Sequence, residues 1–353
     1  MNGQNQDKMI WKAEGTAVPA PSHAAKRPHR RRRHPVRGFF AVLGSLLALI
    51  AIAFFGATTI ICRGPSPAAR DLFVNTVMET SAAKFLARIY FSEEEIAAIR
   101  ARNAVIDENV VTETVDFEET KSDGETPEFE LVDVSGPTFK GKMLIVRDPA
   151  RVSLAVAPVF DPDVAGLRVE EYAEQNGAIA AINGGGFLDE GGVGKGGMPL
   201  GLVIKDGKLL SGGKNTKGSI VGFDNENHLI VGTLTGAECL ERGIRDAVSF
   251  GPAFIVNGEP MDVAGSGGGL NPRTVLGQRA DGAVLMLVID GRQAHSIGAT
   301  YKDCIDVMLE YGAVNAGNLD GGSSSMLVYE GKVQNVCASL YGSRALPTAF
   351  IVK

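Results

Sequence analysis

Residues 39–62 are the sequence feature that most restricts how this chain can fold. They read FFAVLGSLLALIAIAFFGATTIIC, 24 residues without an Asp, Glu, Lys, Arg or His. As a helix this segment would be about 36 Å long, more than the roughly 30 Å of a bilayer's hydrocarbon core. A buried helix of a soluble protein would keep a polar face, and a signal peptide has a shorter apolar region of about 7–15 residues. We therefore expect a retained transmembrane signal-anchor helix at residues 38–62.

The charges on either side of this segment predict its orientation. Residues 1–37 contain nine Lys or Arg against two Asp or Glu, including an arginine run at 30–33. Since basic flanks stay inside the cell, residues 1–37 are predicted to be a cytoplasmic tail, and the rest of this single-pass protein to be extracellular. Residues 63–353 are acidic, with 26 basic and 39 acidic side chains, which argues against nucleic acid as a partner.

Residues 63–135 are predicted to be a helical stalk followed by an acidic linker. Apolar residues recur at helical spacing over 70–90, and Ser92 with Glu95 has the pattern of a capping box that opens a second helix. Residues 105–135 carry eleven acidic side chains and a single Lys. Such a stretch repels itself, so we interpret it as an extended spacer rather than a binding site for a basic partner.

Residues 136–353 have the pattern of an α+β domain. Short β-rich runs alternate with Asp-Gly, Asn-Gly and Glu-Gly turns, and helices are predicted only at about 168–176 and from the N-cap Thr300 to Tyr311. This spacing favours a mixed, largely antiparallel sheet with a few flanking helices over a regular series of βαβ units. The predicted strands are residues 143–146, 152–157, 178–182, 202–204, 219–223, 229–231, 284–289, 326–329 and 348–352.

The first of three candidate clusters in this domain is rich in glycine. A predicted buried strand runs directly into Asn183, Gly184, Gly185 and Gly186. Because glycine has no side chain, backbone N–H groups in such a loop could approach an anion closely. The same residues could equally form an inert turn.

The second cluster combines two arginines with a carboxylate. Arg273 follows Asn271 and Pro272, while Asp290 and Arg292 follow a strongly apolar strand. Guanidinium groups are forked donors that suit phosphate or carboxylate oxygens. An Asp-Gly turn with a surface ion pair is the competing interpretation.

The third cluster is the most distinctive. Asn318 and Asp320 are followed by Gly321, Gly322 and the serines at 323–325. On a strand, Asn318 and Asp320 would point to the same face, so an amide and a carboxylate could contact one ligand. A plain hairpin requires neither this asparagine nor the serines.

The few histidines limit the metal chemistry of the exported part. Only His228 and His295 lie beyond residue 62, and the sequence has no HExxH or CxxC motif. No cofactor is required, and an oxygen-ligated Ca²⁺ or Mg²⁺ site at Asp290 or Asp320 stays open. His295 could be an acid or base, or a solvent-exposed loop residue. A serine hydrolase is disfavoured because there is no G-x-S-x-G elbow.

In this order, the three clusters resemble the phosphodiester glycosidase family. The resemblance covers about residues 140–353, and the matching segments are Asn183-Gly-Gly-Gly-Phe187, Asn271-Pro-Arg-Thr274, Asp290-Gly-Arg292 with Thr300 opening a helix, and Asn318-Leu-Asp-Gly-Gly-Ser-Ser. Two departures affect the expected shape of the pocket. A single aromatic follows three glycines in the first loop, where two aromatics after Asn-Gly-Gly are common, and Ser323 replaces a usual third glycine.

The resemblance implies a hydrolase that cleaves the bond between a sugar's anomeric carbon and a phosphate, in a sugar phosphodiester or cell-surface polysaccharide. It implies carboxylate roles for Asp320 and Asp290. The residues expected to bind substrate are Asn183, Gly184, Gly185, Gly186, Arg273, Arg292, Thr300, Asn318, Gly321, Gly322, Ser323 and Ser324. Two alternatives stay open, namely a non-catalytic module that binds anionic polysaccharide and a metal-dependent phosphodiesterase that cleaves the P–O bond.

Overall fold

The computed structural model describes residues 35–106, 110–114, 116–117, 127–189, 193–339 and 342–353. Most of the predicted cytoplasmic tail therefore lies outside the described residues. The chain divides after Phe55 into two compact units. The described part of the first unit is the start of helix α1 (Pro35–Arg63), which is long and apolar enough to cross a membrane; a signal sequence would meet the same criteria.

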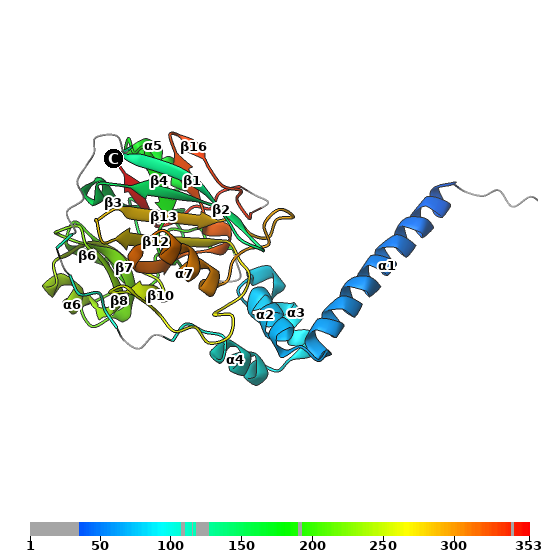
Figure 1. The fold of residues 1–353 in the computed structure, drawn as a ribbon. Helices are drawn as coiled ribbons and strands as arrows, with labels where there is room; N and C mark the ends of the chain where they lie inside the picture. The colour runs from blue at the N-terminus through cyan, green and yellow to red at the C-terminus, as the bar shows by residue number, and fades with distance from the viewer. Residues whose placement is uncertain (1–34, 107–109, 115, 118–126, 190–192, 340–341) are drawn as a thin grey trace, which may run out of the picture. The chain divides into compact units, whose positions relative to one another are not determined.

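Short helices follow α1, as the stalk was predicted to contain (Figure 1). They are α2 (Pro67–Met78), the 3₁₀ turn η1 (Ser81–Ala83), α3 (Lys84–Tyr90) and α4 (Glu93–Ala101). The capping box of Ser92 and Glu95 is confirmed at the start of α4. The predicted helical run over 70–90 is instead interrupted between the end of α2 at Met78 and the start of α3 at Lys84.

The domain consists of three antiparallel sheets with flanking helices, so the predicted α+β class is confirmed. The first sheet has the order β1 (Phe129–Ser135), β2 (Lys140–Val146), β13 (Val284–Ile289), β12 (Arg273–Arg279), β14 (Ala313–Leu319), β10 (Ala253–Val256) and β11 (Glu259–Pro260). The second has the order β16 (Lys332–Val333), β15 (Leu327–Tyr329), β4 (Ala180–Asn183), β17 (Thr348–Val352) and β3 (Val152–Val156). The third has the order β6 (Lys208–Ser211), β5 (Val203–Lys205), β9 (Ile244–Ser249), β7 (Lys217–Asp224) and β8 (Leu229–Thr235).

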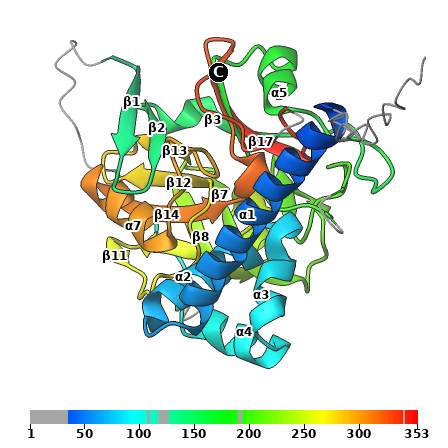
Figure 2. The ribbon, with the colours of Figure 1, turned by 90° about the vertical axis from the view of Figure 1, so that its right-hand side faces the viewer.

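Three α-helices accompany the sheets in the described part of the domain. They are α5 (Val169–Gln175), α6 (Gly236–Glu241) and α7 (Tyr301–Glu310), with 3₁₀ turns η2 (Pro149–Arg151) and η4 (Gly322–Ser324). Helix α7 packs on β10, β12 and β14, and α5 packs on β4, β15 and β17 (Figure 2). The predicted N-cap role of Thr300 is confirmed, since its side chain accepts a hydrogen bond from the N–H of Asp303.

The expected spacer at 105–135 differs from the structure at its C-terminal end, where β1 forms an edge strand of the first sheet. The acidic side chains of β1 are not left to repel one another. Asp133 pairs with Lys142 in β2, and Glu130 pairs with Arg147, which directly follows β2. Cross-strand opposite charges of this kind favour strand pairing, which the count of acidic residues alone did not reveal.

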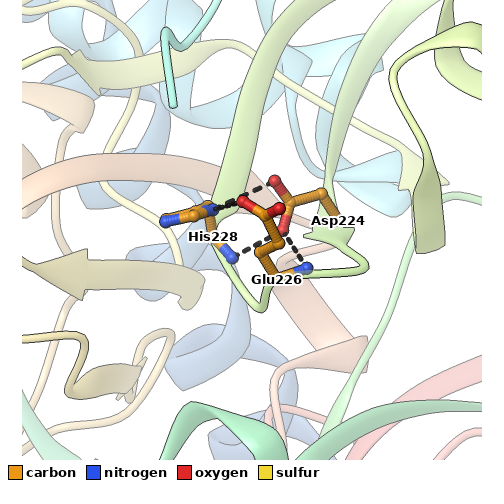
Figure 3. A group of neighbouring side chains, drawn as sticks. All are labelled: Asp224, Glu226 and His228. Atoms are coloured by element: carbon orange, nitrogen blue, oxygen red, sulfur yellow. Dashed lines mark hydrogen bonds and ion pairs between the residues drawn. The ribbon is translucent and has the colours of Figure 1, made fainter. Parts of the chain in front are cut away.

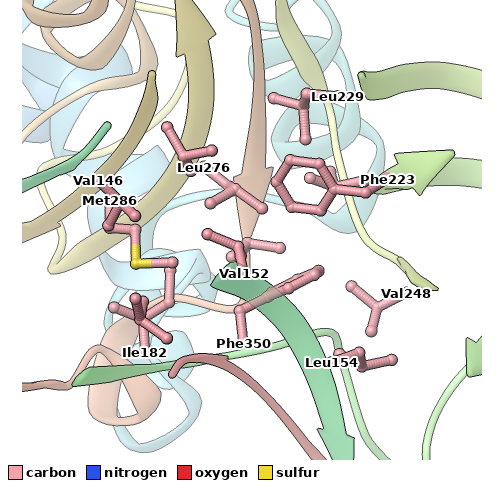
Figure 4. Close-up of a cluster of buried hydrophobic side chains, with 14 of the residues drawn as sticks. Val146, Val152, Leu154, Ile182, Phe223, Leu229, Val248, Leu276, Met286 and Phe350 are labelled. Atoms are coloured by element: carbon pink, nitrogen blue, oxygen red, sulfur yellow. The ribbon is translucent and has the colours of Figure 1, made fainter. Parts of the chain in front are cut away.

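One hydrophobic core joins the three sheets (Figure 4). It takes side chains from each sheet, including Leu276, Phe350 and Phe223, all fully buried. Burying large apolar side chains contributes about 1.5–3 kcal/mol each and fixes the strands relative to one another. As a result β12 begins where its antiparallel neighbours β13 and β14 end, which brings the second and third polar clusters together.

Candidate functional site

A cavity of about 420 Å³ lies at these strand ends. All three predicted clusters contribute to it, through Gly186, Arg292 and the turn after Asp320. Its lining residues are Glu79, Thr80, Ser81, Ala82, Gly186, Phe187, Asp189, Leu200, Phe250, Arg292, Asp320, Gly322, Ser323, Ser324 and Arg344. A polar cavity that gathers carboxylates and guanidinium groups is the natural candidate for a binding or catalytic site.

Asp320 is the carboxylate at the end of β14. Its backbone N–H donates to the Gly184 carbonyl at 3.1 Å, which ties the third cluster to the first. Burial raises the pKa of Asp320 to about 6, although a hydrogen bond from Ser324 and the charge of Arg344 act in the opposite direction. A carboxyl group with a pKa near 6 is suited to act as a general acid or base close to neutral pH.

The Asn183 side chain forms hydrogen bonds that link Asp320 to two other segments of the chain. Its side chain is fully buried, and its Nδ2 donates to the Asp320 carbonyl at 2.6 Å. Its Oδ1 accepts from the Thr274 hydroxyl at 2.8 Å and from the Met326 N–H at 3.1 Å. Asn183 therefore positions Asp320, and the expected contact with a sugar hydroxyl is not supported because its side chain is committed to the protein.

The amides of the glycine loop donate to protein oxygens, so the structure lends no support to the expected anion cradle. The N–H of Gly184 donates to the Thr348 carbonyl, that of Gly185 to the Thr348 hydroxyl, and that of Gly186 to the Ser249 carbonyl. A lack of room for a side chain, rather than anion binding, explains why two of these positions are glycine. A Cβ on Gly184 would lie 2.4 Å from Thr348 Oγ1, and one on Gly185 would lie 2.8 Å from Val248 Cβ.

We expect Gly185→Ala to lower the free energy of unfolding by about 1–3 kcal/mol, because the added methyl group overpacks the contact with Val248. Gly213→Ala is the matched control, since its Cβ would meet only Thr216 Oγ1 at 3.6 Å. Thermal unfolding followed by circular dichroism measures both. Equal melting temperatures for the two variants would show that the loop has room for a side chain.

Arg273 lies behind the cavity wall rather than in it. Its Nε donates to the Ala299 carbonyl, and its NH2 donates to Glu79 Oε2 at 2.7 Å and to the Gly269 carbonyl. The guanidinium also lies 4.1 Å from the centre of the Tyr301 ring. Two of its three nitrogens thus serve protein oxygens, so the structure supports a positioning role and not the expected direct grip on phosphate.

Glu79 is a cavity residue that the sequence did not single out. It is the C-cap residue of α2, in the predicted stalk, and it lines the cavity. Besides its ion pair with Arg273, its carboxylate accepts hydrogen bonds from the Gly269 N–H and from Asn271 Nδ2, each at 2.9 Å. No motif in its neighbourhood signals this role, because the partners of its carboxylate are about 190 residues away in the chain.

Two guanidinium groups line the cavity itself. Arg292, with a positive φ of 58°, donates through NH2 to Asn271 Oδ1 at 3.0 Å. Burial and the neighbouring charge of Arg273 lower the pKa of Arg292, which nevertheless stays far above neutrality as for any arginine. Arg344 forms a bidentate pair with Asp189, at 2.7 and 2.9 Å. The Asp189–Arg344 pair was also missed, since neither residue belongs to a recognisable motif.

Four further expected residues lie outside the cavity lining. Asp290 accepts the Val336 N–H at 2.8 Å and faces His295 Nε2 at 3.3 Å, so it ties two loops together. The Thr300 hydroxyl serves the α7 cap. Asn318 Nδ2 donates to the Gly251 carbonyl, and the Gly321 carbonyl accepts the N–H of Ser324. For these four residues a direct contact with substrate stays a prediction without structural support.

Asp224, Glu226 and His228 form a group that could hold a metal ion, in the turn between β7 and β8 (Figure 3). Asp224 Oδ1 accepts the N–H groups of Glu226 and His228, and His228 Nδ1 lies 3.1 Å from Asp224 Oδ2. These contacts account for the turn without an ion. Neither Asp290 nor Asp320 belongs to a comparable group within the described part of the chain.

Comparisons with known proteins agree with the resemblance carried by the motifs. An uncharacterised SPbeta prophage-derived protein of Bacillus subtilis, YomE, is 30% identical over 177 residues, which are 47% of this chain and 27% of that protein. The N-acetylglucosamine-1-phosphodiester alpha-N-acetylglucosaminidase of Bos taurus is 27% identical over 181 residues, or 46% of this chain and 33% of that protein. The chain thus spans a third or less of the length of these two relatives.

The fold is that of a solved member of the same group. The catalytic domain of the zebrafish enzyme, described as auto-inhibited by its pro-peptide, has a TM-score of 0.53 at 20% identity over 67% of this chain and 87% of that one. The phosphodiester glycosidase family model matches residues 176–353, from the end of α5 to the C-terminus. This match covers half of the chain and includes every motif that lines the cavity, and the chain therefore belongs to the phosphodiester glycosidase family.

Proposed function

We propose that this chain is a membrane-anchored extracellular hydrolase that cleaves the bond between the anomeric carbon of a sugar and a phosphate oxygen. The observation that carries the proposal is a cavity in which the family's Asp320 faces guanidinium groups. The substrate named for the bovine relative makes N-acetylglucosamine the first sugar to test.

The cavity chemistry suits a phosphate leaving group. A phosphate monoester has a second pKa of about 6, so its departure needs little protonation. The demanding part of the reaction is the positive charge that develops at the anomeric carbon, which a carboxylate stabilises. We assign that part to ionised Asp320, acting on the carbon or on the attacking water, and we assign Arg292 to the phosphate oxygens.

This assignment predicts a pH profile. Because the pKa of Asp320 is raised to about 6, kcat/KM should increase as the pH rises through about 6 and the carboxyl group ionises. Ser324→Ala should move this inflection to higher pH, since the lost hydrogen bond stabilises the ionised form. Initial rates on a glycosyl phosphodiester from pH 4 to about 9 measure both. An inflection that stays in place in the variant would assign it to another group.

The origin of the oxygen in the products tests the proposed reaction. Hydrolysis of methyl N-acetylglucosaminyl phosphate in H₂¹⁸O should place the label on C1 of the sugar, because water replaces phosphate at that carbon. Label found in the phosphate would instead indicate a phosphodiesterase that cleaves the P–O bond. Saturable binding without any product would indicate the non-catalytic binding module.

The proposed anchor and topology rest on α1 and on the basic residues before it. Its apolar stretch is exposed, as a segment in contact with lipid would be. A cytoplasmic N-terminus follows from the arginine run at 30–33.

A further inference from the structure

Helix α3 exposes an apolar face bordered by basic residues. Phe85 and Ile89 are 56% and 53% exposed, and they lie one helical turn apart on the same side. Lys84 directly precedes Phe85 in the chain, and Arg88 directly precedes Ile89. Large apolar side chains combined with Lys and Arg are typical of a helix that lies in the interface of a membrane.

The C-terminal end of α3 contacts the last turns of α1. These turns, from Gly56 onward, belong to the same compact unit as the cavity. The Tyr90 hydroxyl lies 2.8 Å from Thr58 Oγ1 and 3.0 Å from Thr59 Oγ1. The Arg63 guanidinium donates to the Tyr90 carbonyl and lies over the ring of Phe91. Helix α3 therefore lies beside Arg63, the charged residue at which the apolar helix α1 ends. If α1 spans a membrane, this end of it would lie at the bilayer surface.

The N-terminal end of α3 lies next to the cavity. Ser81 and Ala82, both exposed, line it immediately before α3 begins at Lys84. Leu200, which is 51% exposed, and Phe250 also line the cavity. Apolar groups are thus present both at the cavity and along the helix that would meet the membrane.

The chain between α1 and the cavity is short. Three residues follow Arg63, and the twelve residues of α2, about 18 Å long, then lead directly to Glu79 in the cavity wall. Adding about 10 Å for the three residues, the wall lies within roughly 30 Å of the end of α1. The site is therefore held near the membrane if α1 is retained.

Resting on the proposed function, we propose that the substrate is a lipid-linked glycosyl phosphodiester, in which the phosphate joins the sugar to a long-chain alcohol embedded in the bilayer. Phe85 and Ile89 dock α3 on that bilayer so that the headgroup enters the cavity. In the reaction the C1–O bond to phosphate breaks and water supplies the hydroxyl on C1. The water's other proton passes to the released lipid phosphate monoester or to solvent, and nothing is oxidised or reduced.

The test compares two substrates on the full-length protein in vesicles of phosphatidylcholine and phosphatidylglycerol. One is a polyprenyl N-acetylglucosaminyl phosphate in the same vesicles, and the other is the water-soluble methyl N-acetylglucosaminyl phosphate. We expect the double substitution Phe85→Ser with Ile89→Ser to lower the rate on the polyprenyl substrate about tenfold, and to change the rate on the methyl substrate less than twofold. The matched control replaces two other exposed apolar residues, Val159→Ser with Leu210→Ser, and should leave both rates unchanged.

The outcomes separate this inference from the proposed function. If the methyl substrate is cleaved but the polyprenyl substrate is not, or if the double variant affects both substrates equally, lipid linkage is wrong while the hydrolase activity stands. If neither substrate is cleaved, the proposed function fails and the inference fails with it. A rate loss confined to the polyprenyl substrate and absent from the control supports the inference.

Discussion

Asp320→Asn should reduce kcat on a glycosyl phosphodiester by about 10³-fold, because it removes the carboxylate to which we assign the stabilisation of charge at the anomeric carbon. The amide is nearly the same size, and burial already disfavours the ionised form of this side chain. The melting temperature should therefore stay the same or rise slightly near neutral pH. Steady-state rates with circular dichroism measure both effects, and undiminished hydrolysis would remove Asp320 from the mechanism.

Asp290→Asn is the matched control, since it makes the same chemical change in another motif aspartate. The Asp290 carboxylate binds the Val336 N–H and faces His295, and it does not line the cavity. We expect a smaller loss of activity, about tenfold, through displacement of the loops that it joins. A loss as large as that of Asp320→Asn would return Asp290 to the catalytic role that the resemblance implies.

The strands that could be predicted from sequence are those whose apolar residues form uninterrupted runs. Strands β13 and β17 match their predicted bounds, because continuous β-branched and aliphatic runs are typical of fully buried strands. Strands β12 and β14 were missed since both carry polar and glycine residues. A Cβ on Gly317 would lie 2.5 Å from Val221 Cγ2, and such close packing is visible only in three dimensions.

The candidate site, like the strands, could be predicted only in part from the sequence. Motif spacing identified Asp320 and Arg292, which do line the cavity. It could not identify the partners that decide what each polar group does. The amides of the glycine loop meet Thr348 and Ser249, and Arg273 meets Glu79, across sequence separations that no local pattern encodes. Residue type and spacing therefore indicated which segments meet at the cavity, but not which partner each polar group binds.

Glu79→Ala should lower the free energy of unfolding by about 3 kcal/mol, because it leaves the Arg273 guanidinium buried without its anion. The Arg273 side chain is only 5% exposed and that of Glu79 is 20% exposed, so water cannot readily replace the carboxylate. Lys302→Ala, which removes one partner of the exposed pair with Asp306, is the control and should change stability by less than about 0.5 kcal/mol. Chemical denaturation monitored by circular dichroism measures both.

The double variant Glu79→Ala with Arg273→Met distinguishes an unpaired charge from a general loss of packing. Removing both charges should recover a large part of the loss, since an apolar replacement of a buried pair is often tolerated. If the double variant is no more stable than Glu79→Ala alone, the contacts of Glu79 with Gly269 and Asn271 matter more than the ion pair. A loss as small as that of Lys302→Ala would mean that the Glu79–Arg273 pair does not stabilise the domain. The expected larger loss would show that the segment after α2, within the predicted stalk, stabilises the domain at the cavity wall.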